Sequence, residues 1–178
     1  MALELWTVDD AKSALGISGD EYDTFIETTL NSIEGYIRSY LGTSVLVKQD
    51  ITDETAENSG VFYATKAYPI HSISALTLEG NDISTDEVMI GYGNIYYPYG
   101  LNGEIVISYN AGFDTDDIAF LKSMVLQYLA FELQNLRGSR WGETSRTFAD
   151  GTASWKTSGE YQKEMAEKLN YYRRTILP

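Results

Sequence analysis

The chain has 178 residues, of which 26 are acidic, 13 are Lys or Arg and none is Cys, so its formal charge is −13. This length is typical of about one domain with a substantial core, and the hydrophobic content of 43% argues against general disorder. The absence of Cys excludes disulfides, thiolate metal sites and a Cys nucleophile. We expect no membrane span, because no apolar stretch approaches about 18 residues, and no export signal, because Met-Ala-Leu-Glu-Leu-Trp is not a signal peptide.

The charge is unevenly distributed along the chain. Residues 1–136 contain five bases and 21 acids, a net charge of −16, whereas residues 137–178 contain eight bases and five acids, a net charge of +3. This asymmetry is typical of an interaction arm on an acidic body. A need for solubility, together with chance, explains the uneven distribution of charge equally well. A protein that grips a DNA duplex carries a basic stripe for the phosphates, and this body has the opposite charge.

Four helices are predicted. Thr7 is a typical N-cap for a first helix that ends at Gly16. A longer helix is expected over residues 19–41, because its apolar residues recur at steps of three and four. Residues 116–136 form a helix that is apolar on much of its circumference, which is typical of a helix central to the core or shared with a neighbouring subunit. A last helix is expected over residues 160–176.

Between residues 43 and 113 the apolar period shortens toward two, which indicates strands. The acidic, turn-rich residues 53–60 are expected to be a loop. The predicted fold class is therefore α+β, mainly a helical bundle with an inserted small antiparallel β-sheet (residues 43–113) and a C-terminal arm plus helix. Residues 1–136 are the predicted core and residues 137–178 the arm with its helix. The predicted strands are 45–47, 61–63, 73–78, 87–90, 95–97 and 103–109.

The side-chain inventory argues against an enzyme. A Ser–His–Asp triad would have to use His71, which directly precedes a predicted strand and is better interpreted as a partly buried imidazole. The segment Gly91-Tyr92-Gly93 lacks the third glycine and the following helix of a dinucleotide loop. Paired acids such as Asp9-Asp10 and Asp116-Asp117 stand at helix starts, where the helix dipole explains them. We predict no catalytic residue, no metal site and no cofactor.

Two groups of aromatic and basic residues are candidate contact sites. Four tyrosines surround Pro98 and offer rigid faces with polar tips, so ordinary sheet packing and partner contact are both open. The arm mixes Arg with large aromatics, the residue types that dominate interface energetics, or it folds back over the body as a loop. The tyrosines are Tyr92, Tyr96, Tyr97 and Tyr99. The arm candidates are Trp141, Arg146, Phe148, Trp155, Arg173 and Arg174.

The order of elements and two short segments form a recognisable pattern. A short helix after Leu5-Trp6-Thr7 leads to a long one that ends at Tyr40-Leu41-Gly42. Residues 68–73 read Tyr-Pro-Ile-His-Ser-Ile, and residues 107–113 read Ile-Ser-Tyr-Asn-Ala-Gly-Phe before another helix. This pattern resembles the head–tail connector proteins of tailed bacteriophages, also called adaptor or head-completion proteins, with their "tPv-x-s-I" segment and "v-x-Y-x-a-G-y" strand end. The resemblance covers residues 5–136.

This resemblance implies a structural protein of the virion neck, made in the bacterial host cytoplasm before assembly. It implies a homo-oligomeric ring of about twelve copies beneath the portal protein. The ring would extend the channel for viral double-stranded DNA and receive the next tail-side connector or tail-terminator protein. The arm candidates would then contact the portal, because family members attach to it by a C-terminal segment. The four tyrosines would be possible subunit contacts.

The resemblance also suggests a role for the acidic body, because a channel wall that repels phosphate lets DNA slide past. A competing hypothesis is a monomeric module that binds a protein or a glycan through the tyrosine-rich surface of residues 92–99.

Overall fold

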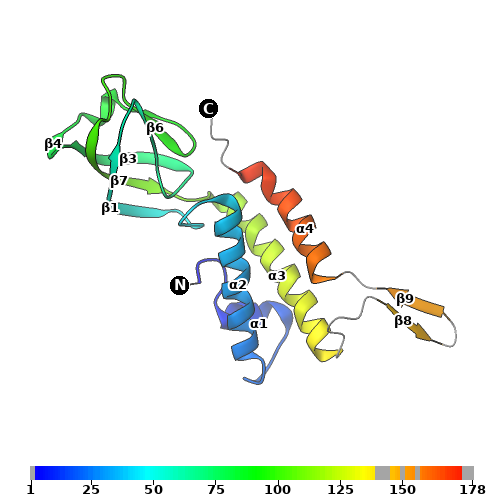
Figure 1. Cartoon of the computed structure of the whole chain (residues 1–178). Helices are drawn as coiled ribbons and strands as arrows, with labels where there is room; N and C mark the ends of the chain where they lie inside the picture. The colour runs from blue at the N-terminus through cyan, green and yellow to red at the C-terminus, as the bar shows by residue number, and fades with distance from the viewer. Residues whose placement is uncertain (1–2, 139–144, 149–150, 155–156, 174–178) are drawn as a thin grey trace. The chain divides into compact units, whose positions relative to one another are not determined.

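The computed structural model describes residues 3–138, 145–148, 151–154 and 157–173, with only the backbone described for 145–148 and 151–154 (Figure 1). The chain forms two compact units. A helical unit is built from residues within 1–41 and 119–173, and a sheet unit is built from residues 42–118. The predicted α+β class is confirmed. The predicted boundary between a core and an arm at residues 136 and 137 stays a prediction.

The helical unit contains the predicted helices, with short strands added. The N-cap prediction is confirmed, because Thr7 Oγ1 accepts a hydrogen bond from the Asp10 amide at 3.1 Å. Gly16, with a φ of 64°, ends the first helix in the left-handed conformation. The elements are α1 (Val8–Leu15), α2 (Asp23–Leu41), α3 (Thr115–Arg137), β8 (Ser145–Phe148), β9 (Gly151–Ser154), α4 (Ser158–Leu169) and the 3₁₀ turn η2 (Asn170–Tyr172).

The core of the helical unit lies between α2, α3 and α4, which run side by side in Figure 1. The apolar stripe of α2 is buried as its spacing predicts, and α3 buries residues on a wide face. Helix α4 ends at Leu169, earlier than predicted, and contributes Met165 and Leu169 to the core. Helix α4 therefore packs with α2 and α3 within one unit.

A buried carboxylate holds the N-terminal segment to α2. Glu34 is fully buried, and its two oxygens accept the amides of Glu4 and Leu5, each at 2.9 Å. Arg38 Nη2, one turn along the helix, donates to Glu34 Oε2 at 3.1 Å and to Glu4 Oε1 at 2.9 Å. The charge is buried with its hydrogen-bond partners, as a buried ion must be.

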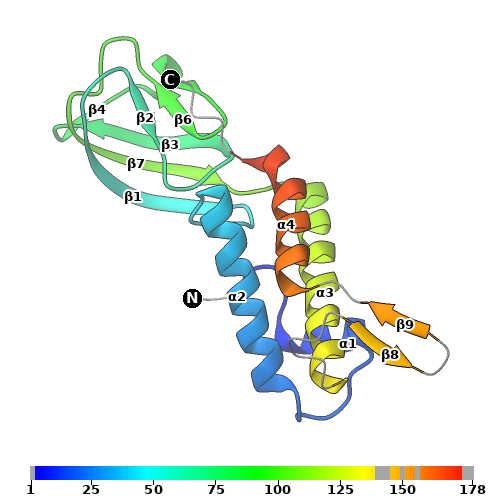
Figure 2. The same ribbon diagram turned by 45° about the vertical axis from the view of Figure 1, so that its right-hand side comes forward.

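The sheet unit consists of two small antiparallel sheets, with the strand orders β1-β7-β3-β4 and β2-β6-β5 (Figure 2). Both sheets contribute to one core, in which Ile105, Ile107 and Tyr109 of β7 meet Tyr63 of β2 and Ile95 of β6. The strands are β1 (Gln49–Asn58), β2 (Phe62–Ala64), β3 (Ile70–Leu78), β4 (Asn81–Asp82), β5 (Met89–Ile90), β6 (Asn94–Tyr96) and β7 (Gly103–Ala111), with a 3₁₀ turn η1 (Thr85–Glu87) before β5.

Three sequence expectations about strands are wrong. Most of the predicted loop 53–60 belongs to β1, and the predicted strand 45–47 contributes only a single bridge, from Val47 to Phe113. The acidic sequence of β1 fits an edge strand, because solvent-facing charges protect a sheet edge from further pairing. The backbones of residues 145–148 and 151–154 form a two-stranded ladder, β8 with β9, where no strand was predicted.

A buried carboxylate also joins the two sheets. Glu54 points inward from β1, is 7% exposed, and accepts Tyr63 Oη at 2.5 Å and Tyr109 Oη at 2.6 Å. The Lys66 amide donates to the same side chain at 3.1 Å, and the Tyr109 hydroxyl accepts the Ala67 amide at 3.1 Å. Burial raises the pKa of Tyr109, and its hydrogen bond to the Glu54 carboxylate raises it further. One side chain therefore links β1, β2 and β7.

Replacing Glu54 by Ala should lower the free energy of unfolding by about 3 kcal/mol, because two buried tyrosine hydroxyls and an amide lose their acceptor. Urea denaturation measures the change. Glu57→Ala is the matched control on the same strand, since Glu57 is exposed and its loss should change stability by no more than about 0.5 kcal/mol. Equal losses in the two variants would contradict the assigned role of Glu54.

Candidate functional site

The four predicted tyrosines lie in the sheet unit, and they divide between packing and exposure. Tyr92 is 48% exposed and packs on Tyr68, with ring centroids 5.5 Å apart. Tyr99 is 76% exposed and contacts Tyr97 edge-on at 5.3 Å. Tyr96 and Tyr97 are half-buried. Because each ring keeps an accessible part while resting on the sheet unit, the group can pack and still meet a partner.

Two further apolar side chains, missed in the sequence, flank Tyr96 on the outer face of the sheet β2-β6-β5. Phe62 of β2 and Met89 of β5 are both directly opposite Tyr96 in the strand register. They are 58% and 67% exposed, and the Phe62 and Tyr96 rings are 4.9 Å apart. We name Phe62, Tyr96 and Met89 the apolar row. Its sequence signal is the presence of large apolar residues on both faces of short predicted strands.

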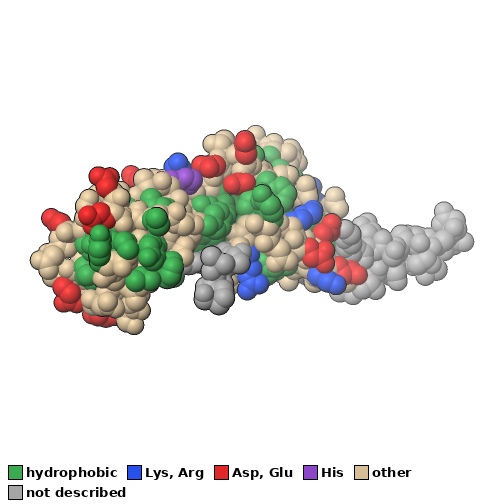
Figure 3. Space-filling view, turned by 90° about the horizontal axis from the view of Figure 1, so that it is seen from above, with side chains coloured by type: hydrophobic (Ala, Val, Ile, Leu, Met, Phe, Trp, Pro, Cys, Tyr) green, Lys and Arg blue, Asp and Glu red, His purple; other side chains and the backbone are tan. Residues whose placement is uncertain are grey.

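The sheet unit carries most of the negative charge. Residues 42–118 contain 12 acids and two bases, Lys48 and Lys66, a net charge of −10. Acidic and hydrophobic side chains are both exposed on this unit in the space-filling view (Figure 3). Asp86 and Glu87 are exposed in η1, just before Met89. Burial raises the pKa of Tyr97, and so does the neighbouring Glu87 carboxylate. The exposed apolar surface therefore has an acidic border.

Of the six arm candidates, only Arg173 has a described side chain. Its guanidinium lies over the Tyr40 ring, 5.7 Å from the centroid, and Tyr40 Oη donates to Asn170 Oδ1 at 2.6 Å. Arg146 and Phe148 lie on β8, of which only the backbone is described. Trp141, Trp155 and Arg174 lie outside the described residues. The structure therefore brings none of these candidates together in a described site.

A second exposed aromatic group lies at the end of the helical unit. Tyr171 is 88% exposed and contacts Tyr172 edge-on, with centroids 5.3 Å apart. Tyr172 stacks on Phe120 of α3 at 5.6 Å, and Phe120 is 37% exposed. Residues 168–173 contain two exposed cations, Lys168 and Arg173, and Lys168 also pairs with Glu164 at 3.8 Å. This aromatic group therefore has cationic neighbours in its own segment, unlike the apolar row.

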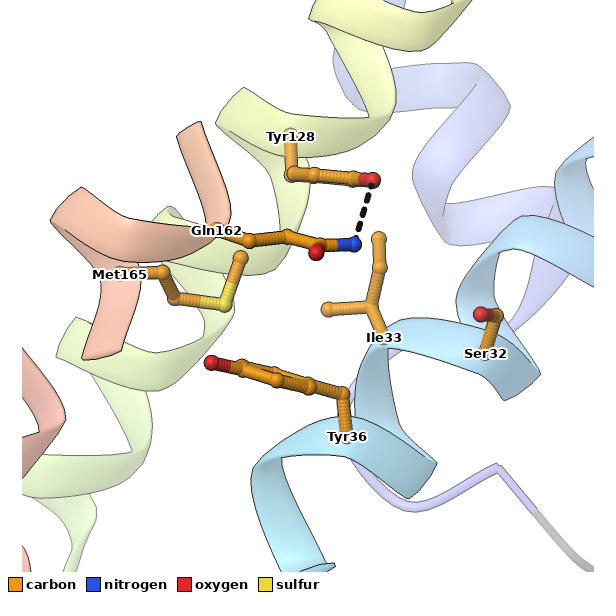
Figure 4. Close-up of a pocket in the computed structure, with 6 residues that line it drawn as sticks. All are labelled: Ser32, Ile33, Tyr36, Tyr128, Gln162 and Met165. Atoms are coloured by element: carbon orange, nitrogen blue, oxygen red, sulfur yellow. Dashed lines mark hydrogen bonds between the residues drawn. The ribbon is translucent and has the colours of Figure 1, made fainter. Parts of the chain in front are cut away.

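The helical unit contains a cavity that is too small for an organic ligand. It measures about 20 Å³, which is room for roughly one water molecule. Figure 4 shows Gln162 of α4 pointing toward Tyr128 of α3, and Gln162 Nε2 donates to the Tyr128 hydroxyl at 3.5 Å. The lining residues are Ser32, Ile33, Tyr36, Tyr128, Gln162 and Met165. Small-molecule pockets have volumes of about 300 Å³ and more. This cavity is therefore not a candidate for substrate binding.

The single histidine of the sequence is partly buried and lies close to a backbone carbonyl. His71 lies at the start of β3 with its side chain 22% exposed, and Nε2 is 2.7 Å from the Gly112 carbonyl oxygen. The interpretation as a partly buried imidazole is confirmed. Within the described part of the chain, no three His, Asp or Glu side chains are grouped as metal ligands. The described helices include none with the length and apolar content needed to cross a membrane.

The Tyr128 hydroxyl predicts a pH dependence for the helical unit. Burial, followed by a hydrogen bond to the Glu132 carboxylate, raises the pKa of Tyr128 from 10 to about 12. The folded state holds the Tyr128 proton more tightly than the unfolded state. The protonated hydroxyl therefore contributes fully to the stability of the folded state below pH 10, and this contribution is lost as the pH rises through 12. The free energy of unfolding of the wild type should therefore fall more steeply over this interval than that of Tyr128→Phe.

Urea unfolding at intervals between pH 9 and 12 measures this difference. The control is Tyr171→Phe, which removes an exposed hydroxyl and should leave the wild-type slope unchanged. Parallel curves for the wild type and Tyr128→Phe would contradict the assignment.

Comparison with known proteins identifies one family and several solved structures that share the fold of this chain. The family model described as "Head completion protein" matches residues 4–175. No curated protein matches the sequence.

Three solved structures share the fold over 100% of this chain. The first, described as "Neck of empty GTA particle computed with C6 symmetry", has a TM-score of 0.51, is 13% identical and is covered over 95% of its length. The second, "Neck of native GTA particle computed with C12 symmetry", has a TM-score of 0.50, 15% identity and 98% coverage. The third, "Virion of native gene transfer agent (GTA) particle", has a TM-score of 0.50, 13% identity and 95% coverage.

Proposed function

The chain belongs to the head completion protein family, and we propose on this basis that it forms a ring in the neck of a tailed phage or phage-like particle, where it joins the head to the tail. The observation that carries the proposal is the family match, which spans residues 4–175 and therefore includes both units. Family membership confirms the resemblance found in the sequence. It also confirms that the chain is a structural protein rather than an enzyme.

The ring is supported by the symmetry of similar folds. Two of the structures that share this fold are necks of gene transfer agent particles computed with C6 and C12 symmetry. We infer a cyclic homo-oligomer of about twelve copies, docked beneath the portal protein. Closed rings need two different contact surfaces on each copy, and exposed tyrosines such as Tyr92 and Tyr99 are available for one of them. Tyr96 and Tyr97 belong to the same proposed subunit contact.

The arm is the proposed portal-docking segment. Residues 137–178 carry a net charge of +3 and interleave Arg with Trp and Phe, which is the composition of strong interface anchors. A lone two-stranded ladder such as β8 with β9 is at best marginally stable in water. Docking on the portal would supply the packing that it needs. The proposed contacts are Trp141, Arg146, Phe148, Trp155, Arg173 and Arg174. The opposite side of the ring would receive the next tail-side protein.

Mixing the purified chain with its portal should give a complex whose mass corresponds to a ring of about twelve copies per portal. Arg146→Ala combined with Trp155→Ala should weaken portal binding at least about tenfold, because two anchor side chains are removed. Native mass spectrometry gives the stoichiometry, and biolayer interferometry gives the affinity.

Lys163→Ala is the matched control, because Lys163 is an exposed cation on α4 outside the proposed contact. Its affinity for the portal should equal that of the wild type. A chain that stays monomeric and never binds portal would contradict the proposed function and would favour the monomeric module that uses residues 92–99.

The acidic sheet unit is proposed to line the DNA channel. Its net charge of −10 would repel the phosphate backbone, so that viral double-stranded DNA slides past without being held. In a cryo-electron microscopy reconstruction of the portal-bound ring, we expect exposed carboxylates such as Asp50, Asp53 and Glu57 to face the lumen. Carboxylates of this unit confined to the outer surface of the ring would contradict this part of the proposal.

A further inference from the structure

The large exposed apolar side chains of the described residues are gathered in two units. Among the described residues, seven large hydrophobic side chains are exposed, and five of them lie between residues 62 and 99 of the sheet unit. The other two, Phe120 and Tyr171, lie in the helical unit and are joined through Tyr172. Scattered exposed hydrophobics need no explanation, but contiguous ones indicate an interaction surface.

The apolar row is built by the backbone register. Phe62, Tyr96 and Met89 stand side by side on three adjacent strands, while Tyr63 and Ile95 point to the opposite face and are buried. Successive side chains of a strand point to opposite faces of the sheet, so the alternation that buries Tyr63 and Ile95 in the core also places the apolar row on the outer face. The row is apolar, and the exposed carboxylates of η1 lie just before Met89 in the chain.

The second surface has exposed cations beside its exposed tyrosine. Tyr171 is the most exposed of these aromatic side chains, and two exposed cations lie in its segment: Lys168, which also pairs with Glu164 at 3.8 Å, and Arg173, which lies over the Tyr40 ring. An apolar row with an acidic border is thus complementary to an exposed tyrosine with cationic neighbours. Both surfaces belong to the same chain.

Two complementary but different surfaces on one chain are the requirement for head-to-tail association, which closes into a ring when the rotation permits. A self-complementary dimer would instead place one acidic border against another, with like charges facing each other. The observations therefore favour a second copy of this chain as the occupant of the apolar row.

We propose that the apolar row of one copy packs against Tyr171 of the next copy, and that this contact links neighbouring subunits of the ring. The proposal rests on the proposed function and adds Phe62 and Met89 to the subunit contact. Tyr171 supplies the aromatic side chain, and Lys168 faces the acidic border formed by Asp86 and Glu87.

The absence of Cys makes a direct test possible, because single cysteines can be placed in a background without thiols. One protein carries Met89→Cys and a second, differently tagged protein carries Tyr171→Cys. The two are mixed with the portal, the ring-sized fraction is isolated, and a short bismaleimide is added. A cross-linked dimer that contains both tags is expected, at about ten times the yield obtained with Thr55→Cys in place of Met89→Cys. Thr55 is exposed on β1, which belongs to the other sheet.

The outcomes separate the proposals. Rings that form without the mixed cross-link overturn the contact and leave the ring intact. Cross-linking of Met89→Cys to itself shows face-to-face pairing and overturns the head-to-tail contact. A chain that carries both cysteines and cross-links only within itself overturns the contact as well. Failure of the wild type to form any oligomer with the portal overturns the proposed function together with this contact.

A second measurement uses no cross-linker. Phe62→Ser combined with Met89→Ser should reduce the fraction of protein in the ring at least about tenfold, because the apolar surface available for association is lost. Both side chains are more than half exposed in the single chain, so the midpoint of thermal unfolding of the unassembled protein should stay close to that of the wild type. An unchanged ring fraction would contradict the proposal.

Discussion

The sheet unit depends on one buried carboxylate. Glu54 accepts hydrogen bonds from Tyr63 on one sheet and Tyr109 on the other, and it also accepts the Lys66 amide. These donors compensate the cost of removing the carboxylate from water. Through them the edge strand β1 is attached to the core and the two small sheets enclose one set of apolar side chains. Because Tyr63 of β2 is held inward by Glu54, the neighbouring Phe62 and the rest of the apolar row lie on the outer face of the sheet β2-β6-β5.

A second carboxylate plays a comparable part in the helical unit. Glu34 holds the amides of Glu4 and Leu5 and is paired with Arg38 one turn away. Some of the acidic residues that contribute to the net charge of −13 are therefore buried. Glu34, Glu54 and Glu132 are buried, and the first two organise backbone amides. The other acids of the sheet unit lie at its surface and give that surface its negative charge.

The surfaces of the chain fit an assembly protein better than a ligand-binding one. The cavity of the helical unit has room for about one water molecule, whereas both units expose large aromatic or aliphatic side chains. The charge of these surfaces differs, with acids beside the apolar row and cations beside Tyr171. In the proposed ring, such a pairing would let copies associate in one direction, and the acidic surface would repel DNA. This combination is consistent with head completion, the role by which the family is described.

The sequence by itself determined the helices, because capping residues such as Thr7 and Gly16 and an apolar period of 3.6 act within a few residues. It also determined the strand β7 and the setting of His71, both of which follow from local alternation and turn residues. It misread β1, because an acidic stretch resembles a loop until a partner strand and a buried acceptor site are present.

The apolar row, like the inward position of Glu54, could not be read from local sequence. Phe62, Tyr96 and Met89 are separated in sequence and meet only through the register of three strands. Local patterns depend on neighbouring residues along the chain, whereas a buried carboxylate and a cross-strand row depend on contacts between distant segments. Only the tertiary structure brings those segments together.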